Sequence, residues 1–126
     1  MRFYSPEWVA AFNDAVAGMA ADPGAAFCLV QVVDAGPDGT ISIVLHVDDR
    51  GVRMARDPAP EPAPDVTVSL GYDDAVALAR GESSPALLLG TGRVKVRGDL
   101  GALARGQAVL AEAVARVASL SEVTTF

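Results

Sequence analysis

Residues 65–74 read DVTVSLGYDD, and within this stretch the pattern of a strand changes to the beginning of a helix. Val66, Val68 and Leu70 alternate with hydroxyl side chains, which is the period of a strand that buries one face. Tyr72-Asp73-Asp74 then begins a short helix. The middle of the chain is therefore predicted to be a half-buried strand that runs directly into a helix.

The residues before this step predict one helix and several strands. Ser5-Pro6 begins the helix, because Ser caps helix N-termini and Pro suits the first helical position. Its apolar stripe runs from Trp8 to Met19, and Asp22-Pro23-Gly24 ends it. Residues 26–34 are apolar on both faces apart from Gln31, which predicts a central strand. Further strands are expected at residues 41–48 and 52–56, each after a turn.

After the step, the sequence predicts two short helices, a strand and a long helix. The first short helix turns Val76 and Leu78 inward and ends at Gly81, and the second begins at Ser84-Pro85 and carries Leu87-Leu88-Leu89. A strand is expected at residues 93–97. The apolar stripe of the last helix consists of Leu103, Leu110, Val114 and Val117. This order of elements is typical of an α+β domain.

The proline-rich stretch at residues 58–64 is the one segment that looks like a linker. Its four prolines favour an extended chain without hydrogen-bond donors for a sheet. Only 62 residues follow it, and they open with a strand. We therefore expect a loop inside a single domain that spans residues 1–126.

Composition excludes several classes of protein. The chain has 126 residues and a formal net charge of −6, so nucleic acid is not an expected partner. The single Cys28 forms no disulfide within the chain and no thiolate metal site, which suits a reducing cytoplasm. No secretory signal or membrane-spanning run is recognised. The excess of Arg over Lys and the many Ala residues favour a GC-rich bacterial source.

The sequence offers no set of residues for catalysis. His46 is the only histidine, it lies in a predicted strand, and no third group accompanies it. Cys28 lies in the most apolar strand, where a buried thiol is inert. The adjacent Asp48-Asp49 falls in turn sequence, where acidic residues are common. We therefore predict no enzyme activity, no cofactor and no metal site. The three successive leucines cannot all face one way, so they either fill the core or line a cavity.

Three stretches in the second half are similar to motifs of the sterol carrier protein type 2 family. They are the strand-to-helix step at 65–74, Leu78-Ala79-Arg80-Gly81-Glu82, and Gly92-Arg93-Val94-Lys95-Val96-Arg97-Gly98-Asp99. The resemblance implies a five-stranded mixed, mostly antiparallel sheet with helices packed over one face, enclosing an apolar tunnel. It also implies binding and transfer of a hydrophobic ligand: a fatty acyl chain, an isoprenoid, a phospholipid or a sterol-like lipid. The side chains then expected to line the tunnel are Val66, Val68, Leu70, Leu78, Leu87, Leu88, Val94, Val96 and Leu103.

Two further interpretations stay open at this point. In the first, the domain is an accessory or interaction module with a collapsed cavity that assists a partner enzyme, or it forms a homodimer. The second concerns Arg93, Lys95 and Arg97, which alternate along the last predicted strand and form the one concentrated basic patch. That patch is either a solvated outer face or a transient contact with a membrane surface.

Overall fold

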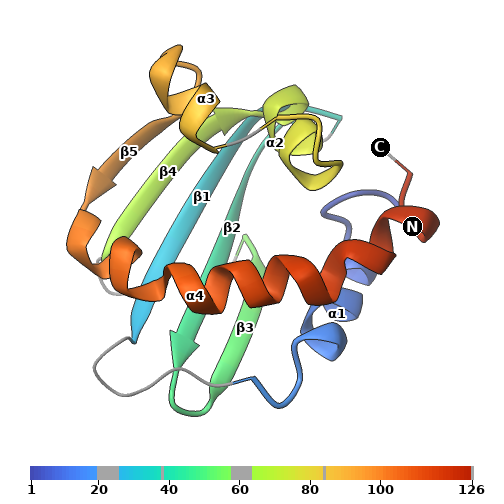
Figure 1. The fold of residues 1–126 in the computed structure, drawn as a ribbon. Coiled ribbons are helices and arrows are strands. Elements are labelled where there is room, and N and C mark those ends of the chain that lie inside the picture. Colours follow the sequence, from blue (N-terminus) through green and yellow to red (C-terminus); the bar gives the residue numbers. More distant parts are fainter. Residues whose placement is uncertain (20–25, 38, 58–63, 84, 126) are drawn as a thin grey trace.

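The computed structural model describes residues 1–19, 26–37, 39–57, 64–83 and 85–125 (Figure 1). The predicted helix end at residues 22–24, most of the proline-rich stretch and the predicted cap Ser84 lie outside these ranges. The elements, in chain order, are α1 (Pro6–Ala15), β1 (Phe27–Gly36), β2 (Gly39–Asp48), β3 (Gly51–Arg56), β4 (Val66–Gly71), α2 (Tyr72–Ala79), α3 (Pro85–Gly90), β5 (Lys95–Gly98), α4 (Leu100–Val117) and the 3-10 helix η2 (Ala118–Val123).

The five strands form one sheet in the order β3-β2-β1-β4-β5. β1 lies at the centre, as its apolar sequence predicts. It pairs antiparallel with β2 and parallel with β4, while β2–β3 and β4–β5 are antiparallel. The predicted mixed, mostly antiparallel sheet of an α+β domain is therefore confirmed.

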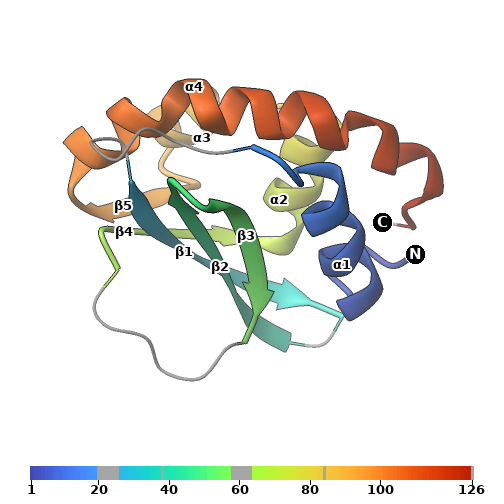
Figure 2. The same ribbon diagram turned by 90° about the horizontal axis from the view of Figure 1, so that it is seen from below.

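The helices lie over one face of the sheet, as seen edge-on in Figure 2. The register places Gln31 beside Ile43 on one side and Val68 on the other, so the three side chains share a face. This is the apolar face, because Ile43 is 1% exposed and belongs to the main hydrophobic core. The opposite, outer face carries Lys95 and Arg97, which pair with Ser69 and Thr67.

α1 is shorter than its apolar stripe predicts. The Ser5 side chain accepts a hydrogen bond from the backbone N–H of Trp8, at 3.2 Å, so the predicted cap is present. The helix ends at Ala15, and Gly18 follows with φ of 85°. Val16 and Met19 are nevertheless buried, because the turn directs them into the core. The periodicity identified the buried residues correctly but overestimated the length of the helix.

The side chain of Asn13 connects α1 to the free edge of the sheet. Its amide donates to the carbonyl oxygen of Met54, at 3.0 Å, and accepts from the N–H of Met54, at 2.7 Å. Because Met54 belongs to the edge strand β3, these bonds satisfy backbone groups that have no strand partner. They also fix α1 beside the sheet.

The Gly98-Asp99 pair turns the chain from β5 into α4. Gly98 has φ of 107°, and a Cβ there would lie 2.2 Å from the carbonyl oxygen of Asp65, so only glycine fits. Asp99 then caps α4 by accepting from the N–H of Ala102, at 3.1 Å. The close approach to Asp65 requires the glycine and the cap of α4 requires the aspartate, which accounts for the Gly98-Asp99 pair at the end of the motif at residues 92–99.

α4 approaches the sheet through small residues rather than through the predicted stripe. Ala102, Gly106 and Ala113 are its buried positions. Leu103, Leu110 and Val117 are only partly buried, and Val114 is 66% exposed, so its predicted burial is wrong. A Cβ on Gly106 would lie 2.1 Å from Cε1 of Phe27. The ring of Phe27 therefore packs directly on the helix backbone, a contact that a search for large apolar residues does not detect.

We expect Gly106→Ala to lower the free energy of unfolding by up to about 2 kcal/mol. The methyl group overpacks the Phe27 contact, which costs about 1–3 kcal/mol, while the better helix propensity of Ala returns about 1 kcal/mol. Urea unfolding measures the difference. Gly90→Ala in α3 is the control, because no atom lies within 4 Å of a Cβ built there. A Gly106 variant as stable as the control would contradict the close contact.

Candidate functional site

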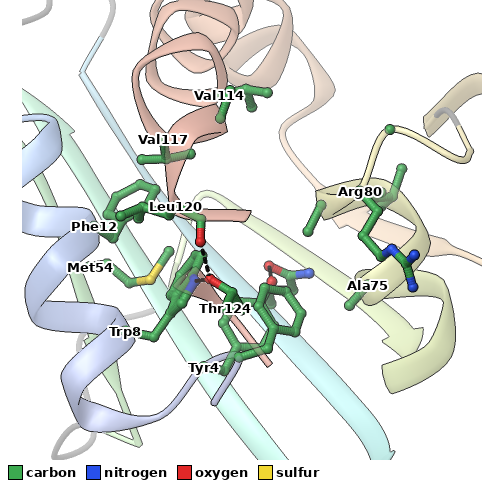
Figure 3. A pocket seen from close by; sticks show the side chains of 16 residues that line it. Tyr4, Trp8, Phe12, Met54, Ala75, Arg80, Val114, Val117, Leu120 and Thr124 are labelled. Carbon is green, nitrogen blue, oxygen red and sulfur yellow. Dashed lines mark hydrogen bonds between the residues drawn. The ribbon is translucent and has the colours of Figure 1, made fainter. Parts of the chain in front are cut away.

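A cavity of about 490 Å³ lies between the sheet and the helices, where the ends of α1, α2 and α4 meet (Figure 3). This volume is within the usual range for small-molecule sites, about 300–1,000 Å³. Its lining residues are Phe3, Tyr4, Trp8, Phe12, Gln31, Met54, Ala75, Leu78, Ala79, Arg80, Gly81, Val114, Val117, Ala118, Leu120 and Thr124.

Four aromatic rings near the N-terminus form one wall of the cavity. The ring centroids of Phe3 and Tyr4 are 3.9 Å apart, and Trp8 meets both rings edge-on at 5.1 and 5.3 Å. Phe12 stacks on Trp8 at 5.8 Å. Contacts of this kind hold large apolar side chains in fixed positions. The wall is therefore apolar and well ordered by its own packing.

The backbone around Tyr4 is shaped to place that ring. Tyr4 has φ of 59°, in the left-handed region that non-glycine residues rarely adopt. The guanidinium of Arg56 donates to the carbonyl oxygen of Tyr4, at 3.1 Å. The backbone N–H of Ser5 donates to the carbonyl oxygen of Arg2, also at 3.1 Å. These bonds stabilise a turn whose strained centre lies at the cavity.

The C-terminal residues close the cavity against the N-terminal residues. The indole N–H of Trp8 donates to the hydroxyl of Thr124, at 3.1 Å, and this hydroxyl donates to the carbonyl oxygen of Leu120. The N–H of Phe3 donates to the carbonyl oxygen of Thr125, at 3.0 Å. Figure 3 shows Trp8, Leu120 and Thr124 gathered on one side of the cavity. Both ends of the chain therefore contribute to its wall.

The polar groups in the wall are few, and they differ in their surroundings. The hydroxyl of Tyr4 donates to Oε1 of Gln31, at 3.2 Å. Burial raises the pKa of the Tyr4 phenol above its usual value near 10, so the phenol stays neutral even in alkaline solution where an exposed tyrosine ionises. Arg80 instead lies at the surface, with its side chain 50% exposed and paired with Glu82 at 3.1 Å. Together with the exposed Val114, Arg80 marks the side on which the cavity meets solvent.

Among the side chains predicted to line a tunnel, Leu78 lines this cavity. The others lie elsewhere on the described chain. Val66, Leu70, Leu88 and Val94 are buried, whereas Val68, Val96 and Leu103 are partly buried. Leu87 is 58% exposed on α3. Their contact with a ligand, and a tunnel that passes through the domain, stay predictions.

The sequence interpretation did not place the aromatic wall or the C-terminal residues at the site. The apolar stripe predicted for the first helix includes Trp8 and Phe12, and both are buried. A stripe does not show, however, whether a buried residue packs in the core or lines a cavity. Gln31 left a clearer signal, because it is the one polar residue that interrupts the apolar run of the central strand.

A smaller recess of about 250 Å³ lies at the other end of β1 and contains Cys28, His46, Asp48 and Asp65 among its lining residues. Cys28 and His46 are cross-strand partners. The carboxylate of Asp65 accepts from the N–H of Cys28, at 2.8 Å, and Asp48 pairs with Arg53 at 2.9 Å. The hydrogen bonds from the Arg53 side chain and, to a smaller extent, from the backbone N–H of Arg50 lower the pKa of Asp48 to about 2. Within the described ranges, no cluster of three or more His, Cys, Asp or Glu side chains is arranged to hold a metal ion.

The basic residues near β5 do not act as one group. β5 begins at Lys95, so Arg93 precedes it, contrary to the predicted strand at 93–97. The guanidinium of Arg93 pairs with the carboxylate of Asp74, at 2.9 Å. Lys95 and Arg97 remain exposed on the outer face. The basic patch of the structure therefore consists of these two residues.

A mixed sheet covered on one face by helices, with an apolar cavity between the two layers, defines a class of small α+β domains. Within this class, the chain belongs to the SCP-2 sterol transfer family, whose model matches residues 12–111. A comparison of the sequence with curated proteins finds no significant match.

Solved structures show the same fold. A crystal structure of sterol carrier protein 2 matches with a TM-score of 0.70 and 17% identity, over 93% of this chain and 98% of that one. Palmitated sterol carrier protein 2-like 2 from Aedes aegypti matches with a TM-score of 0.57 and 20% identity, over 86% and 88%.

A larger protein contains a similar fold. The sec-alkylsulfatase Pisa1 from Pseudomonas sp. matches with a TM-score of 0.51 and 22% identity, over 74% of this chain but only 13% of that chain.

In the part of this chain that the structure describes, no helix has the length and apolar character needed to cross a membrane.

We expect alkali to destabilise the protein partly through Tyr4. The phenol is neutral in the folded state because its pKa is raised, whereas in the unfolded state it ionises near pH 10. Its contribution to stability is therefore complete below about pH 10 and is lost as the pH rises further. Between about pH 9 and pH 11, Tyr4→Phe should lose about 1 kcal/mol less unfolding free energy than the wild type. Equal losses by urea unfolding would contradict the buried, neutral phenol.

Proposed function

We propose that this chain binds a hydrophobic ligand in the cavity and carries it, without catalysing a reaction. The observation that carries this proposal is the cavity of about 490 Å³, whose wall is built mainly from aromatic and aliphatic side chains. Cavities of this kind, with few polar groups, are typical of small-molecule sites. A fatty acyl chain, an isoprenoid, a phospholipid or a sterol-like lipid has the required apolar surface. We propose a cytoplasmic location for this carrier.

Burial of apolar surface alone supplies enough free energy for such binding. Each buried CH₂ contributes roughly 0.8 kcal/mol, so a chain of about ten carbons yields about 8 kcal/mol before the costs of association. No catalytic group takes part in this. The palmitated relative from Aedes aegypti supports an acyl chain as one ligand class.

Ligand binding is expected to change the fluorescence of Trp8, because Trp8 is the only tryptophan of the chain and lines the cavity. Palmitate added to delipidated protein should change the Trp8 emission saturably. Ala79→Phe should weaken this binding at least tenfold, because Ala79 lines the cavity and a ring there occupies its space. Fluorescence titration measures both effects.

The matched control is Ala77→Phe, which adds the same ring to α2 at a position that does not line the cavity. Both variants need cooperative thermal unfolding before they are compared. Wild-type protein that binds no lipid of any chain length would overturn the carrier function. Equal affinities of the two variants would place the ligand elsewhere.

We further propose that Lys95 and Arg97 contact anionic membranes during transfer. Each basic residue near a charged membrane surface contributes about 1 kcal/mol, and salt screens this attraction beyond about 10 Å at 0.1 M. Replacing both residues by Gln should slow transfer from vesicles that contain phosphatidylserine, at low salt, severalfold. Binding of free lipid should not change, because both residues lie on the outer face of the sheet.

The control for this experiment removes the same charge elsewhere, with Arg50→Gln and Arg105→Gln. Arg50 lies between β2 and β3, and Arg105 lies on α4, where its nearest carboxylate, that of Asp99, is 3.8 Å away. Arg93 is left unchanged in both proteins, because it pairs with Asp74. Transfer rates that fall equally in both double variants would assign the effect to net charge rather than to β5.

The accessory function is the second candidate. The similarity to a segment of the sec-alkylsulfatase favours it, because there a domain of this fold forms part of a larger enzyme. In that case the domain would assist a partner enzyme, and the cavity would hold part of an apolar substrate or no ligand. The Trp8 titration separates the two candidates, since a carrier binds lipid without a partner.

A further inference from the structure

We propose that Gln31, oriented by Tyr4, forms a hydrogen-bonding subsite that receives the uncharged, oxygen-bearing end of the ligand. The matching group is a hydroxyl or an ester carbonyl on an otherwise apolar molecule. This inference rests on the proposed lipid-binding function and adds the chemical class and orientation of the ligand.

The position of Gln31 is unusual for a polar side chain. It lies on the helix-covered face of the central strand, between Leu29 and Val33, with Ile43 and Val68 as its cross-strand neighbours. An amide on an apolar face costs free energy unless its hydrogen bonds are made. A leucine or valine would satisfy packing there, so folding alone does not explain the amide.

The hydrogen bond between Tyr4 and Gln31 uses the amide oxygen of Gln31 and leaves the amide donors at the wall of the cavity. Oε1 of Gln31 accepts from the hydroxyl of Tyr4, at 3.2 Å, which fixes the amide orientation. The amide nitrogen carries two N–H donors. Within the described ranges this nitrogen donates to no protein group, and Gln31 lines the cavity. The subsite therefore offers donors to a ligand oxygen.

The charges around the cavity favour a neutral ligand end. Arg80 is the one charged side chain among the described lining residues, and it is half-exposed and paired with Glu82. Arg56, on the same sheet face as Gln31, is engaged by Asp57 at 3.6 Å and by the carbonyl oxygen of Tyr4. A carboxylate placed at Gln31 would lose its hydration without gaining a cation, so a fatty acid such as palmitate would bind with its carboxylate on the solvent side, where Arg80 lies. A hydroxyl or ester carbonyl carries no such penalty.

A pair of ligands of equal length tests the subsite. Decanol and decyl chloride have the same apolar chain, but only decanol has an oxygen that accepts a hydrogen bond. Both displace N-phenyl-1-naphthylamine, a fluorescent apolar probe, in a competition assay. In Gln31→Leu we expect the affinity for decanol to fall about fivefold relative to decyl chloride, the usual effect of one neutral hydrogen bond. Met54→Leu, which alters an apolar part of the same wall, should change both affinities in parallel.

A second variant guards against a folding defect. Gln31→Leu leaves the hydroxyl of Tyr4 without its acceptor, whereas Tyr4→Phe combined with Gln31→Leu removes both partners of this bond. The double variant should show the same loss of preference for decanol, with cooperative thermal unfolding. If Gln31→Leu fails to fold, the double variant decides the question.

The outcomes separate this inference from the proposed function. If the probe and both ligands bind but the decanol preference is the same in wild type and Gln31 variants, the subsite is overturned and the carrier function stands. Decanoate that binds more tightly than decanol, in a way that depends on Gln31, would overturn the neutral ligand class. Wild-type protein that binds neither the probe nor the ligands would overturn both proposals.

Discussion

The rest of the structure depends on the contact between the ring of Phe27 and the backbone of Gly106. It sets the distance between α4 and the sheet, because no side chain on the helix separates the two. At the far end of α4, the layers are separated by aromatic rings from residues 3–12 instead. Small residues at one end and large rings at the other make the gap between the layers wider at the far end, which is where the cavity lies. The cavity therefore results from the size distribution of the side chains along the interface.

The approximate positions of the strands and the central place of the first one could be predicted, because period and burial are local properties of the sequence. Residues 26–34 are apolar on both faces, and β1 indeed lies at the centre of the sheet. The step at residues 65–74 also holds, since β4 ends at Gly71 and α2 begins at Tyr72. Helix ends were less accurate. α1 stops at Ala15 although its stripe continues to Met19, because a turn can bury the same side chains as a helix.

The position of the cavity could not be predicted in this way. Periodicity shows which face of a strand is buried, but it does not distinguish a residue packed on others from one beside a void. Val66 and Leu70 are buried without lining the cavity, whereas Thr124 lines it through a bond to Trp8. Contacts between such distant residues depend on the complete fold. Gln31 is the exception, since a polar residue in an apolar central strand is visible in the sequence alone.

Both proposed functions, that of a carrier and that of an accessory domain, depend on the same cavity. An apolar wall can hold many ligands of similar shape, and such binding needs no reacting group. Selectivity must then come from the few polar groups in the wall. Arg80 is half-exposed, so solvent screens its charge. The Tyr4–Gln31 pair lies among apolar side chains, where a hydrogen bond is stronger than in water. The pair is neutral, so the proposed subsite would discriminate ligands by their ability to accept a hydrogen bond rather than by charge. A domain built in this way can accept lipids with different chains while still distinguishing their polar ends.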